Sequence, residues 1–463
     1  MAKGRSFIIG VGMTKFVKPT SEVDYPKMGR EAITKALLDA HITYNEVQQA
    51  VASYCYGDST CGQRVLYQLG MTQIPIYNVN NNCASGSSAI VLARNLVSHG
   101  AAGCVLVVGF EKMSTGSLGA NFHDRADPLG PVAAMSSRIN RNYDGVSDQV
   151  PFAIRMFGDA AREYMQLYGA ESDDFAEIAR VNHAHSRNNP YAQFRDVYSM
   201  EEIKGSPTIY APLTKLQCCP TSNGASAAVV VSESFLSSHP QLWPQAVEII
   251  GQSIVTDSPA TYNGSAMNAV GYEMSKKAGA NALREGGVSI TDVKIVELHD
   301  CFSSSEMITL DALGLASHGK AHEYVRRGGL TFGSGAAIIN PSGGLLSKGH
   351  PLGATGIAQC AELVWHLRGW ANNRYIPLKS NEVTLQHNVG LGGAGVVTIL
   401  RRADCKPNTK MTDKEVAEIT GIGYNPATEA RPLTVEQAQK VRALERSDWM
   451  FRYKQEGSAR PNI

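Results

Sequence analysis

The sequence lacks the features that mark membrane-spanning, nucleic-acid-binding and disulfide-stabilised proteins. No apolar run approaches the roughly 20 residues that a membrane helix needs. The 43 basic and 42 acidic residues leave a net charge of only +1, which gives no basis for a nucleic-acid partner. Nine cysteines are scattered without a Cys-x-x-Cys pair, which argues against a zinc site or a disulfide framework and favours a reducing compartment.

The chain instead alternates apolar runs typical of strands with stretches of helical periodicity. Residues 51–56 and 104–110 are predicted strands, and residues 24–40 have the apolar spacing of a helix. The second strand is continuously apolar, as expected when both of its faces are covered. Strands that alternate with helices predict an α/β fold with a largely parallel sheet.

The pattern of the first part of the chain returns in the second part. Residues 293–300 repeat the pattern of residues 51–58, and residues 395–400 repeat that of residues 105–109. Self-similarity of this kind indicates duplication of a βαβ-rich half. We therefore expect two similar halves that are related by a pseudo-twofold axis.

We divide the chain into two halves, an insertion and an extension. The first half comprises residues 1–120 with residues 220–245, and the second half comprises residues 246–403. Frequent Gly, Pro, Asp and Arg and two long helices mark residues 121–219 as an inserted loop domain, and such insertions usually carry binding surface. Residues 404–463 are polar, and two capping-box patterns predict short helices there.

Cys83 is the first candidate for chemistry, because it lies in a small-residue turn between a β-rich run and a stretch of helical spacing. Free N–H groups and the dipole at a helix N-terminus stabilise anions, so we expect this thiol to ionise below its usual pKa of about 8.5 and to act as a nucleophile. A buried structural cysteine is the alternative. His350 opens a second such helix, and the pseudo-twofold axis would bring both residues into one site.

Three further loops carry polar side chains where sites in α/β sheets tend to form. His299 and Cys301 directly follow an apolar strand, and His350 follows Lys348 and Gly349. The third loop begins at His387 and is rich in glycine. Each of these histidines alone could also be an ordinary structural residue.

Together, four ordered segments resemble the thiolase family. They are N-x-C-A-S-G at residues 81–86, G-F-E-K-M-S at 109–114, N-P-S-G-G at 340–344 and G-H-P-L-G-A-T-G at 349–356. Their order and spacing are similar to those of thiolases over roughly residues 5–403. Four motifs in one chain are far more specific than a single glycine-rich loop.

Three other segments are similar to one branch of the family, the thiolases of sterol carrier protein X. They are H-D-C-F at residues 299–302, G-D-S-T-C-G-Q-R at 57–64 and L-Q-C-C-P-T-S at 216–222. In that branch the thiolase continues into a lipid-carrier domain. The 60 residues after the core are too few for such a domain, so we expect this chain to lack it.

The resemblance implies a thiolase fold, with duplicated halves in a layered α-β-α-β-α core and an inserted loop domain. It also implies thiolysis of 3-oxoacyl-CoA by CoA to acetyl-CoA or propionyl-CoA and a shortened acyl-CoA, in fatty acid or sterol side-chain oxidation. Cys83 would be the nucleophile and His350 its base. Backbone N–H groups of Cys83 and Gly392 would hold one oxyanion, and His350 with His299 would hold the thioester oxygen.

One part of the family pattern is missing. Most thiolases protonate the leaving enolate with a cysteine in a C-x-G loop, but this chain reads Gly390-Leu391-Gly392 there. Cys301 would supply the thiol from a different loop. A proton transfer through water or His299 is the alternative.

The resemblance also implies that the loop domain binds CoA. Arg155, Met156 and Phe157 align with a stretch that lines the pantetheine tunnel, although ordinary helix packing would explain them equally well. CoA and acyl-CoA would be substrates, with no permanently bound cofactor and no metal. Thiolases are homodimers or dimers of dimers and work in peroxisome-type organelles or mitochondria, but neither end of this chain has a clear targeting signal.

Two other functions fit parts of the pattern. A condensing synthase of the same superfamily would share the fold, but it would lack the context of Lys348 and His350 and the paired cysteines. An acyl-CoA or sterol binding protein that has lost turnover is favoured by the missing cysteine at Gly390. Acyl transfer assayed in both directions would separate these functions from thiolysis.

Overall fold

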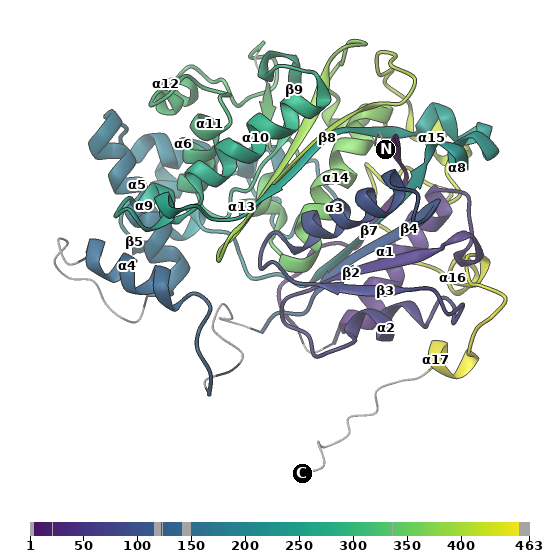
Figure 1. Cartoon of the computed structure of the whole chain (residues 1–463). Helices are drawn as coiled ribbons and strands as arrows, with labels where there is room; N and C mark the ends of the chain where they lie inside the picture. The colour runs from purple at the N-terminus through teal and green to yellow at the C-terminus, as the bar shows by residue number, and fades with distance from the viewer. Residues whose placement is uncertain are drawn as a thin grey trace.

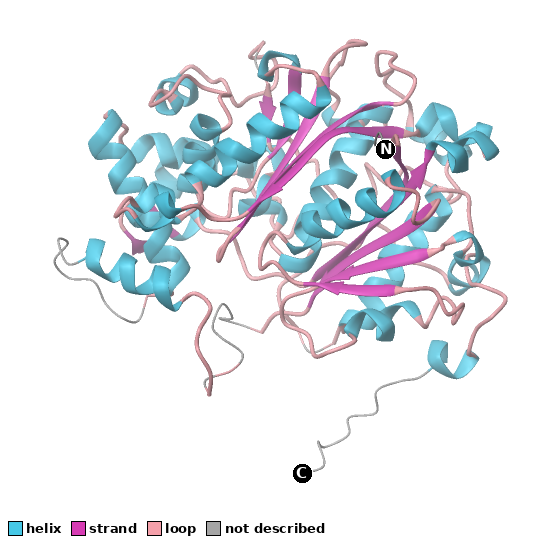
Figure 2. Ribbon diagram, in the orientation of Figure 1, coloured by secondary structure: helices cyan, strands magenta, loops and turns pink. Residues whose placement is uncertain are grey.

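The computed structural model describes most of the chain, and one long sheet forms its centre (Figures 1 and 2). The described residues are 4–20, 22–114, 122, 124–140, 150–335 and 337–452. The expectation that neither end carries a clear targeting signal concerns the two ends of the chain, and these lie outside this range. Among the described residues, no helix is both long enough and apolar enough to cross a membrane.

The strand order of the sheet is symmetric about its middle. It runs β10-β9-β11-β12-β8-β1-β7-β4-β2-β3, and β1 joins β8 through only two residue pairs. In each half, two parallel pairings are followed by two antiparallel ones, so β2 corresponds to β9 and β7 to β12. The sheet is therefore mixed, and the expectation of a largely parallel sheet was wrong. The strands are β1 Ser6–Met13, β2 Gln49–Ser53, β3 Ile76–Val79, β4 Cys104–Glu111, β7 Gly224–Ser232, β8 Val247–Val255, β9 Val293–Glu297, β10 Ile338–Ile339, β11 Val383–Gly390 and β12 Ala394–Arg402.

The structure confirms the duplication and corrects one of the two correspondences. Residues 293–300 contain β9, the counterpart of β2, as the sequence predicted. The match of residues 395–400 with residues 105–109 was wrong, because β12 corresponds to β7 and β4 corresponds to β11. All of these strands are buried apolar runs, and such a run does not show whether its neighbour is parallel or antiparallel.

The two halves of the sheet form two β layers, and helices outside and between them complete the five-layered α-β-α-β-α arrangement that the resemblance implied (Figure 1). Helix α1 covers the outer face of the first half, α10 covers the outer face of the second half, and α3 and α14 lie between the halves. The Asp24 side chain caps α1 by accepting from the Tyr25 N–H at 2.8 Å, which is why the predicted helix begins there. The helices of the two halves are α1 Tyr25–Asp39, α2 Cys61–Leu66, α3 Ser85–Ser98, α8 Glu233–Ser238, α9 Ala266–Ala269, α10 Tyr272–Gly286, α11 Ser303–Ala312, α12 Ala321–Arg326, α13 Gly344–Lys348 and α14 Leu352–Arg368.

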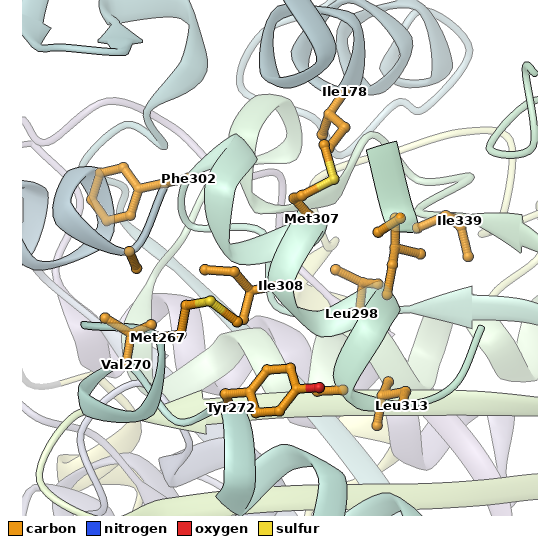
Figure 3. Packing of buried hydrophobic residues seen from close by; sticks show 14 of the residues in the cluster. Ile178, Met267, Val270, Tyr272, Leu298, Phe302, Met307, Ile308, Leu313 and Ile339 are labelled. Atoms are coloured by element: carbon orange, nitrogen blue, oxygen red, sulfur yellow. The ribbon is translucent and has the colours of Figure 1, made fainter. Parts of the chain in front are cut away.

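The insertion between β4 and β7 packs against the second half rather than standing apart. Figure 3 shows Ile178 of the insertion in one hydrophobic cluster with Met307 and Phe302 of the second half. This shared core fixes the insertion next to the loop that carries His299 and Cys301. Its elements are α4 Gly130–Asn140, α5 Phe152–Tyr168, α6 Ser172–Ser186, α7 Met200–Gly205, β5 Thr208–Tyr210 and β6 Leu213–Thr214.

The segment after β12 packs against both halves. It contains α15 Asp413–Ile419, α16 Val435–Lys440 and α17 Asp448–Arg452, and both predicted capping boxes are present. Its Val416, Ala427 and Ala443 side chains are fully buried, and the Ala443 N–H donates to the Leu69 carbonyl at 2.9 Å. The described part of the extension therefore contributes to the core.

The variant Gly421→Ala tests whether the extension packs against the core. A Cβ on Gly421 would overlap with the backbone carbonyl of Leu38, so Gly421→Ala has to push the extension away from α1. We expect the variant to lose about 1–3 kcal/mol of unfolding free energy, as overpacking usually costs, measured by thermal or urea unfolding. Gly205→Ala is the control, because its Cβ would meet no atom within 4 Å. Equal stability of the two variants would contradict the docking of the extension.

Candidate active site

Cys83 lies in a tight turn between β3 and α3, as predicted, and its side chain is partly buried. Asn82 before it has a φ of +52°, a left-handed conformation that asparagine adopts more readily than most residues. The Ser85 hydroxyl accepts from the Asn81 N–H at 2.9 Å and donates to the Asn82 carbonyl at 2.6 Å. These bonds hold the nucleophile turn in one conformation.

The predicted pseudo-twofold relation brings Cys83 and His350 into one site together with His299. The Cys83 Sγ atom and one ring nitrogen of each histidine all lie within 4.8 Å of one another. The two imidazole rings are nearly perpendicular, with centroids 5.1 Å apart and an interplanar angle of 83°. Zinc accepts such ligands, and the expectation that the site needs no metal stays a prediction.

Hydrogen bonds at His350 assign its two ring nitrogens different roles. The Thr355 hydroxyl donates its only proton to the Pro351 carbonyl at 3.0 Å, so its oxygen accepts from His350 Nδ1–H at 2.8 Å. Nε2 then carries the free lone pair of the ring. Within the described part of the chain, this buried Nε2 has no hydrogen-bond partner. It is therefore available as a base for Cys83.

Hydrogen bonds at His299 favour the opposite arrangement. The Asn388 side-chain NH₂ group lies 2.9 Å from His299 Nδ1, and an NH₂ group can only donate. With the amide in this orientation, Nδ1 accepts and the proton of the neutral ring is on Nε2. The Ser305 hydroxyl also donates to the His299 carbonyl at 2.7 Å and holds the loop. One histidine thus presents an acceptor to the site, and the other presents a donor.

The site is electrically neutral at rest, which corrects the expectation of a lowered thiol pKa. Burial, opposed by a backbone hydrogen bond, raises the pKa of the Cys83 thiol to about 12. Burial lowers the pKa of His350 to about 3, and burial with the nearby His350 and His387 holds the pKa of His299 well below its usual value. At pH 7 the thiol is protonated and both imidazoles are neutral. The loss of hydration thus outweighs the helix N-terminus.

Cys301 is buried beside the nucleophile, and a second thiol residue faces it. Burial, with Cys219, Cys83 and Asp300 close by, raises the pKa of Cys301 well above its usual value. The Cys219 N–H donates to the Cys301 carbonyl at 2.9 Å, next to a bridge between Cys218 and Phe302. The sequence had suggested the segment around Cys219 only as a mark of one branch. The structure places this segment opposite Cys301.

The structure explains why no thiol is present at position 390. A Cβ on Gly390 would overlap with the Asn81 carbonyl, so the close contact between β11 and the nucleophile turn requires glycine. Gly392 lies in the turn that follows, with a φ of +94°. This turn contacts the site through Asn82, whose amide donates to the Leu391 carbonyl at 3.2 Å. Gly392 is therefore near the nucleophile turn, but its role stays a prediction.

Glu111 is a site residue that sequence reasoning missed. Its buried carboxylate accepts the backbone N–H groups of Cys55 at 3.0 Å, Tyr56 at 2.8 Å and Gly353 at 3.0 Å. It thereby joins the loop after β2 to the first turn of α14, directly after His350. Burial raises the pKa of Glu111 to about 7. The only signal was its place in the G-F-E-K-M-S segment, which does not indicate its contacts.

The residues predicted to bind CoA lie on α5, close to the catalytic loop. Met156 and Phe157 are buried, and the Phe157 ring packs on Phe302 with centroids 4.9 Å apart. Arg155 is partly buried. Phe157 also lines a small hollow, partly open to solvent, together with Tyr272 and other residues of the second half. The packing of Met156 and Phe157 fits a structural role, and CoA contact stays a prediction.

Comparison with known proteins now identifies the class. Residues 6–234 match the family model described as thiolase, N-terminal domain, and residues 257–402 match the one described as thiolase C-terminal domain-like. The chain belongs to the thiolase family, which are acyltransferases of lipid metabolism.

The chain is also similar to individual proteins of known name. Sterol carrier protein 2 from Rattus norvegicus is 52% identical over 401 residues, which cover 86% of this chain and 72% of the rat protein. Non-specific lipid-transfer protein-like 2 from Caenorhabditis elegans is 44% identical, with coverage of 86% of this chain and 96% of the worm protein. The Ltp2-ChsH2(DUF35) aldolase shares the fold, with a TM-score of 0.72, 23% identity and coverage of 87% of this chain and 98% of that one.

Because the Cys83 thiol and the His350 imidazole are both neutral at rest, the reactivity of Cys83 should depend on pH. Because the thiolate is the reactive form and the pKa of Cys83 is raised to about 12, the rate of Cys83 alkylation by iodoacetamide should rise by about tenfold per pH unit from pH 6 to 9. Mass spectrometry of the Cys83 peptide would follow the rate, and Cys83→Ser would reveal alkylation of other residues. A rate that is constant over this range would instead indicate a preformed thiolate–imidazolium pair.

Proposed function

We propose that this protein cleaves 3-oxoacyl-CoA by thiolysis, as thiolases related to sterol carrier protein X do. The observation that carries the proposal is the meeting of Cys83, His299 and His350 within 4.8 Å, with one imidazole as acceptor and the other as donor. The reaction needs a nucleophile, a base and stabilisation of negative charge on two carbonyl oxygens. These side chains, with the nearby backbone, meet those needs in one buried place.

The first half of the reaction would transfer the acyl group to Cys83. The thiol gives its proton to His350 Nε2 as sulfur attacks the 3-keto carbon, because a neutral thiol of raised pKa ionises only as the bond forms. The N–H groups of Cys83 and Gly392 would stabilise the oxygen at that carbon. The bond between C2 and C3 then breaks and leaves an acetyl-CoA or propionyl-CoA enolate. The His350 imidazolium and His299 Nε2–H would stabilise the enolate oxygen.

The second half would return the acyl group to CoA. Cys301 donates its proton to C2 of the enolate and becomes a thiolate. It then takes the proton of the incoming CoA thiol, which attacks the Cys83 thioester and releases the shortened acyl-CoA. His350 returns its proton to the Cys83 sulfur. The raised pKa of Cys301 fits this sequence, because it keeps the thiol protonated at rest and makes its thiolate a strong base.

A homodimer is part of the proposal, and β3 supports it. This strand is at the edge of the sheet and exposes Tyr77 to 39%. Exposed edge strands pair readily with another chain, and a second copy can pair across a twofold axis. The Asn80–Asn82 turn follows β3 directly, so such pairing would place the partner close to the active site.

A binding protein without turnover is the second candidate. The relative named a lipid-transfer protein and the glycine at position 390 favour it. The two candidates differ in whether Cys83 becomes acylated and whether acetoacetyl-CoA is consumed when CoA is added. Loss of the absorbance of the magnesium enolate of acetoacetyl-CoA measures the second point directly.

Cys83 is expected to form an acyl-enzyme. Incubation with acyl-CoA, proteolysis and mass spectrometry should place the acyl group on the peptide that contains Cys83, because its sulfur lies close to His350, whose Nε2 is unpaired within the described part of the chain. The Cys83→Ser protein, treated in the same way, should carry no acyl thioester. An acyl group found on Cys301 instead would overturn the assignment of the nucleophile.

Cys301→Ala should separate acylation from thiolysis. The variant should still form the Cys83 thioester with a plain acyl-CoA, but acetoacetyl-CoA thiolysis should fall by about 10²–10⁴, the usual worth of a positioned proton donor. Cys104→Ala, which removes an equally buried thiol from β4, should keep its activity. More than about a third of the wild-type rate in Cys301→Ala would exclude the acid/base role.

A further inference from the structure

Asp300 lies between His299 and Cys301, and the reaction described above leaves it without a role. Its side chain is completely buried and accepts three N–H donors. Oδ1 accepts the Leu345 N–H at 2.6 Å, and Oδ2 accepts the Leu346 N–H at 3.3 Å and the Asn182 amide at 2.9 Å. A buried carboxylate with three donors is a fixed part of the framework rather than a solvated charge.

Two of these donors belong to the short helix that leads to His350. Helix α13 ends at Lys348, and Gly349 and His350 follow at once. The carboxylate pairs N–H groups of its first turn, which have no partner within a helix. Helix α13 packs closely against Asp300, because a Cβ on Gly344 would overlap with the Asp300 carboxylate. The loop with His299 and Cys301 is thus joined to the segment with His350 through one side chain.

The third donor extends this connection to the inserted domain. The Asn182 NH₂ group on α6 donates one proton to Asp300 and the other to Glu306 Oε2 at 2.8 Å. Asn340 donates to the same Glu306 oxygen at 2.8 Å and accepts the Leu298 N–H at 2.9 Å. The network therefore holds the catalytic loop on both sides of His299 and ties it to α6.

We infer that Asp300 is a positioning residue, whose carboxylate fixes the loop of His299 and Cys301 relative to the segment of His350. The inference rests on the proposed thiolysis, in which these three side chains act on one substrate. Misplacement of reacting groups by about 1 Å can cost about 10² in rate, so a clamp between the two loops affects turnover without touching the substrate. Burial, with Glu306 close by, raises the pKa of Asp300 well above its usual value, and the N–H groups of Leu345 and Leu346 oppose this shift by favouring the ionised form.

The variant Asp300→Asn tests the clamp. It keeps the size of the side chain but places an NH₂ group where only N–H donors face it, so at least one contact is lost. We expect kcat for acetoacetyl-CoA thiolysis to fall by about 10- to 100-fold, while KM for acetoacetyl-CoA and for CoA changes by less than about threefold. Amide hydrogen exchange in peptides that cover residues 343–350 should become faster, because the single side-chain oxygen of asparagine leaves the Leu345 or the Leu346 amide without its acceptor.

Asp311→Asn is the matched control, because Asp311 is on α11, the helix that directly follows the loop of Asp300. The Asp311 carboxylate is buried and accepts the Gly319 N–H at 2.5 Å and the Tyr164 hydroxyl at 3.1 Å, but it does not contact the catalytic loops. We expect it to lose stability while keeping kcat and the exchange rates of residues 343–350. If Asp300→Asn does not fold, Asn182→Ala removes one of the three donors to Asp300, together with one donor to Glu306, and should lower kcat by about two- to tenfold.

Each outcome decides the inference. Wild-type kcat in Asp300→Asn, or in Asn182→Ala where the first variant does not fold, would overturn it. Unchanged hydrogen exchange at residues 343–350 in Asp300→Asn would also overturn it, because the clamp would then not hold α13. If the wild-type protein fails to cleave acetoacetyl-CoA, the proposed thiolysis is wrong, and the exchange experiment still tests the clamp by itself.

Discussion

The close contact between α3 and α14 is the constraint on which the active site depends. A Cβ on Gly86 would lie 2.9 Å from the Gly353 carbonyl, and one on Gly356 would overlap with Ser87. Small residues let the two helices meet at their first turns. Cys83 and His350 directly precede these turns, so the contact places both residues in the same buried space. Larger side chains at these glycines would separate Cys83 from His350 without changing either residue.

The same burial determines the electrostatics of the site. Removal from water favours neutral forms, which is why the thiol keeps its proton and the imidazoles remain uncharged. A site of this kind stabilises charge only where hydrogen bonds have already oriented the donors and acceptors. Thr355 and Asn388 provide that orientation, since each fixes Nδ1 of one histidine and leaves Nε2 for the reaction. In the proposed thiolysis, the proton would therefore move as bonds form rather than before them.

The sequence predicted the parts of the site that are local and missed those that depend on distant contacts. The turns at Cys83 and His350 can be recognised from small residues between a strand and a helix, and the α/β fold follows from the alternation of elements. The bond from Glu111 to the Gly353 N–H joins residues 242 positions apart, and no periodicity reports it. The pKa of Cys83 was predicted in the wrong direction for the same reason, because its burial comes from the whole fold.

The close packing of β11 against the Cys83 turn explains why this chain departs from other thiolases at position 390. Where β11 passes the nucleophile turn, the Asn81 carbonyl occupies the space of a side chain at position 390, so glycine is required. Thiols from other loops lie near Cys83, among them Cys301 in the loop after β9 and Cys219. Cys301 is buried there, and its backbone is held by Cys219. The close packing of β11 against the turn therefore accounts for the glycine at position 390, and the proposed role of Cys301 is a separate matter.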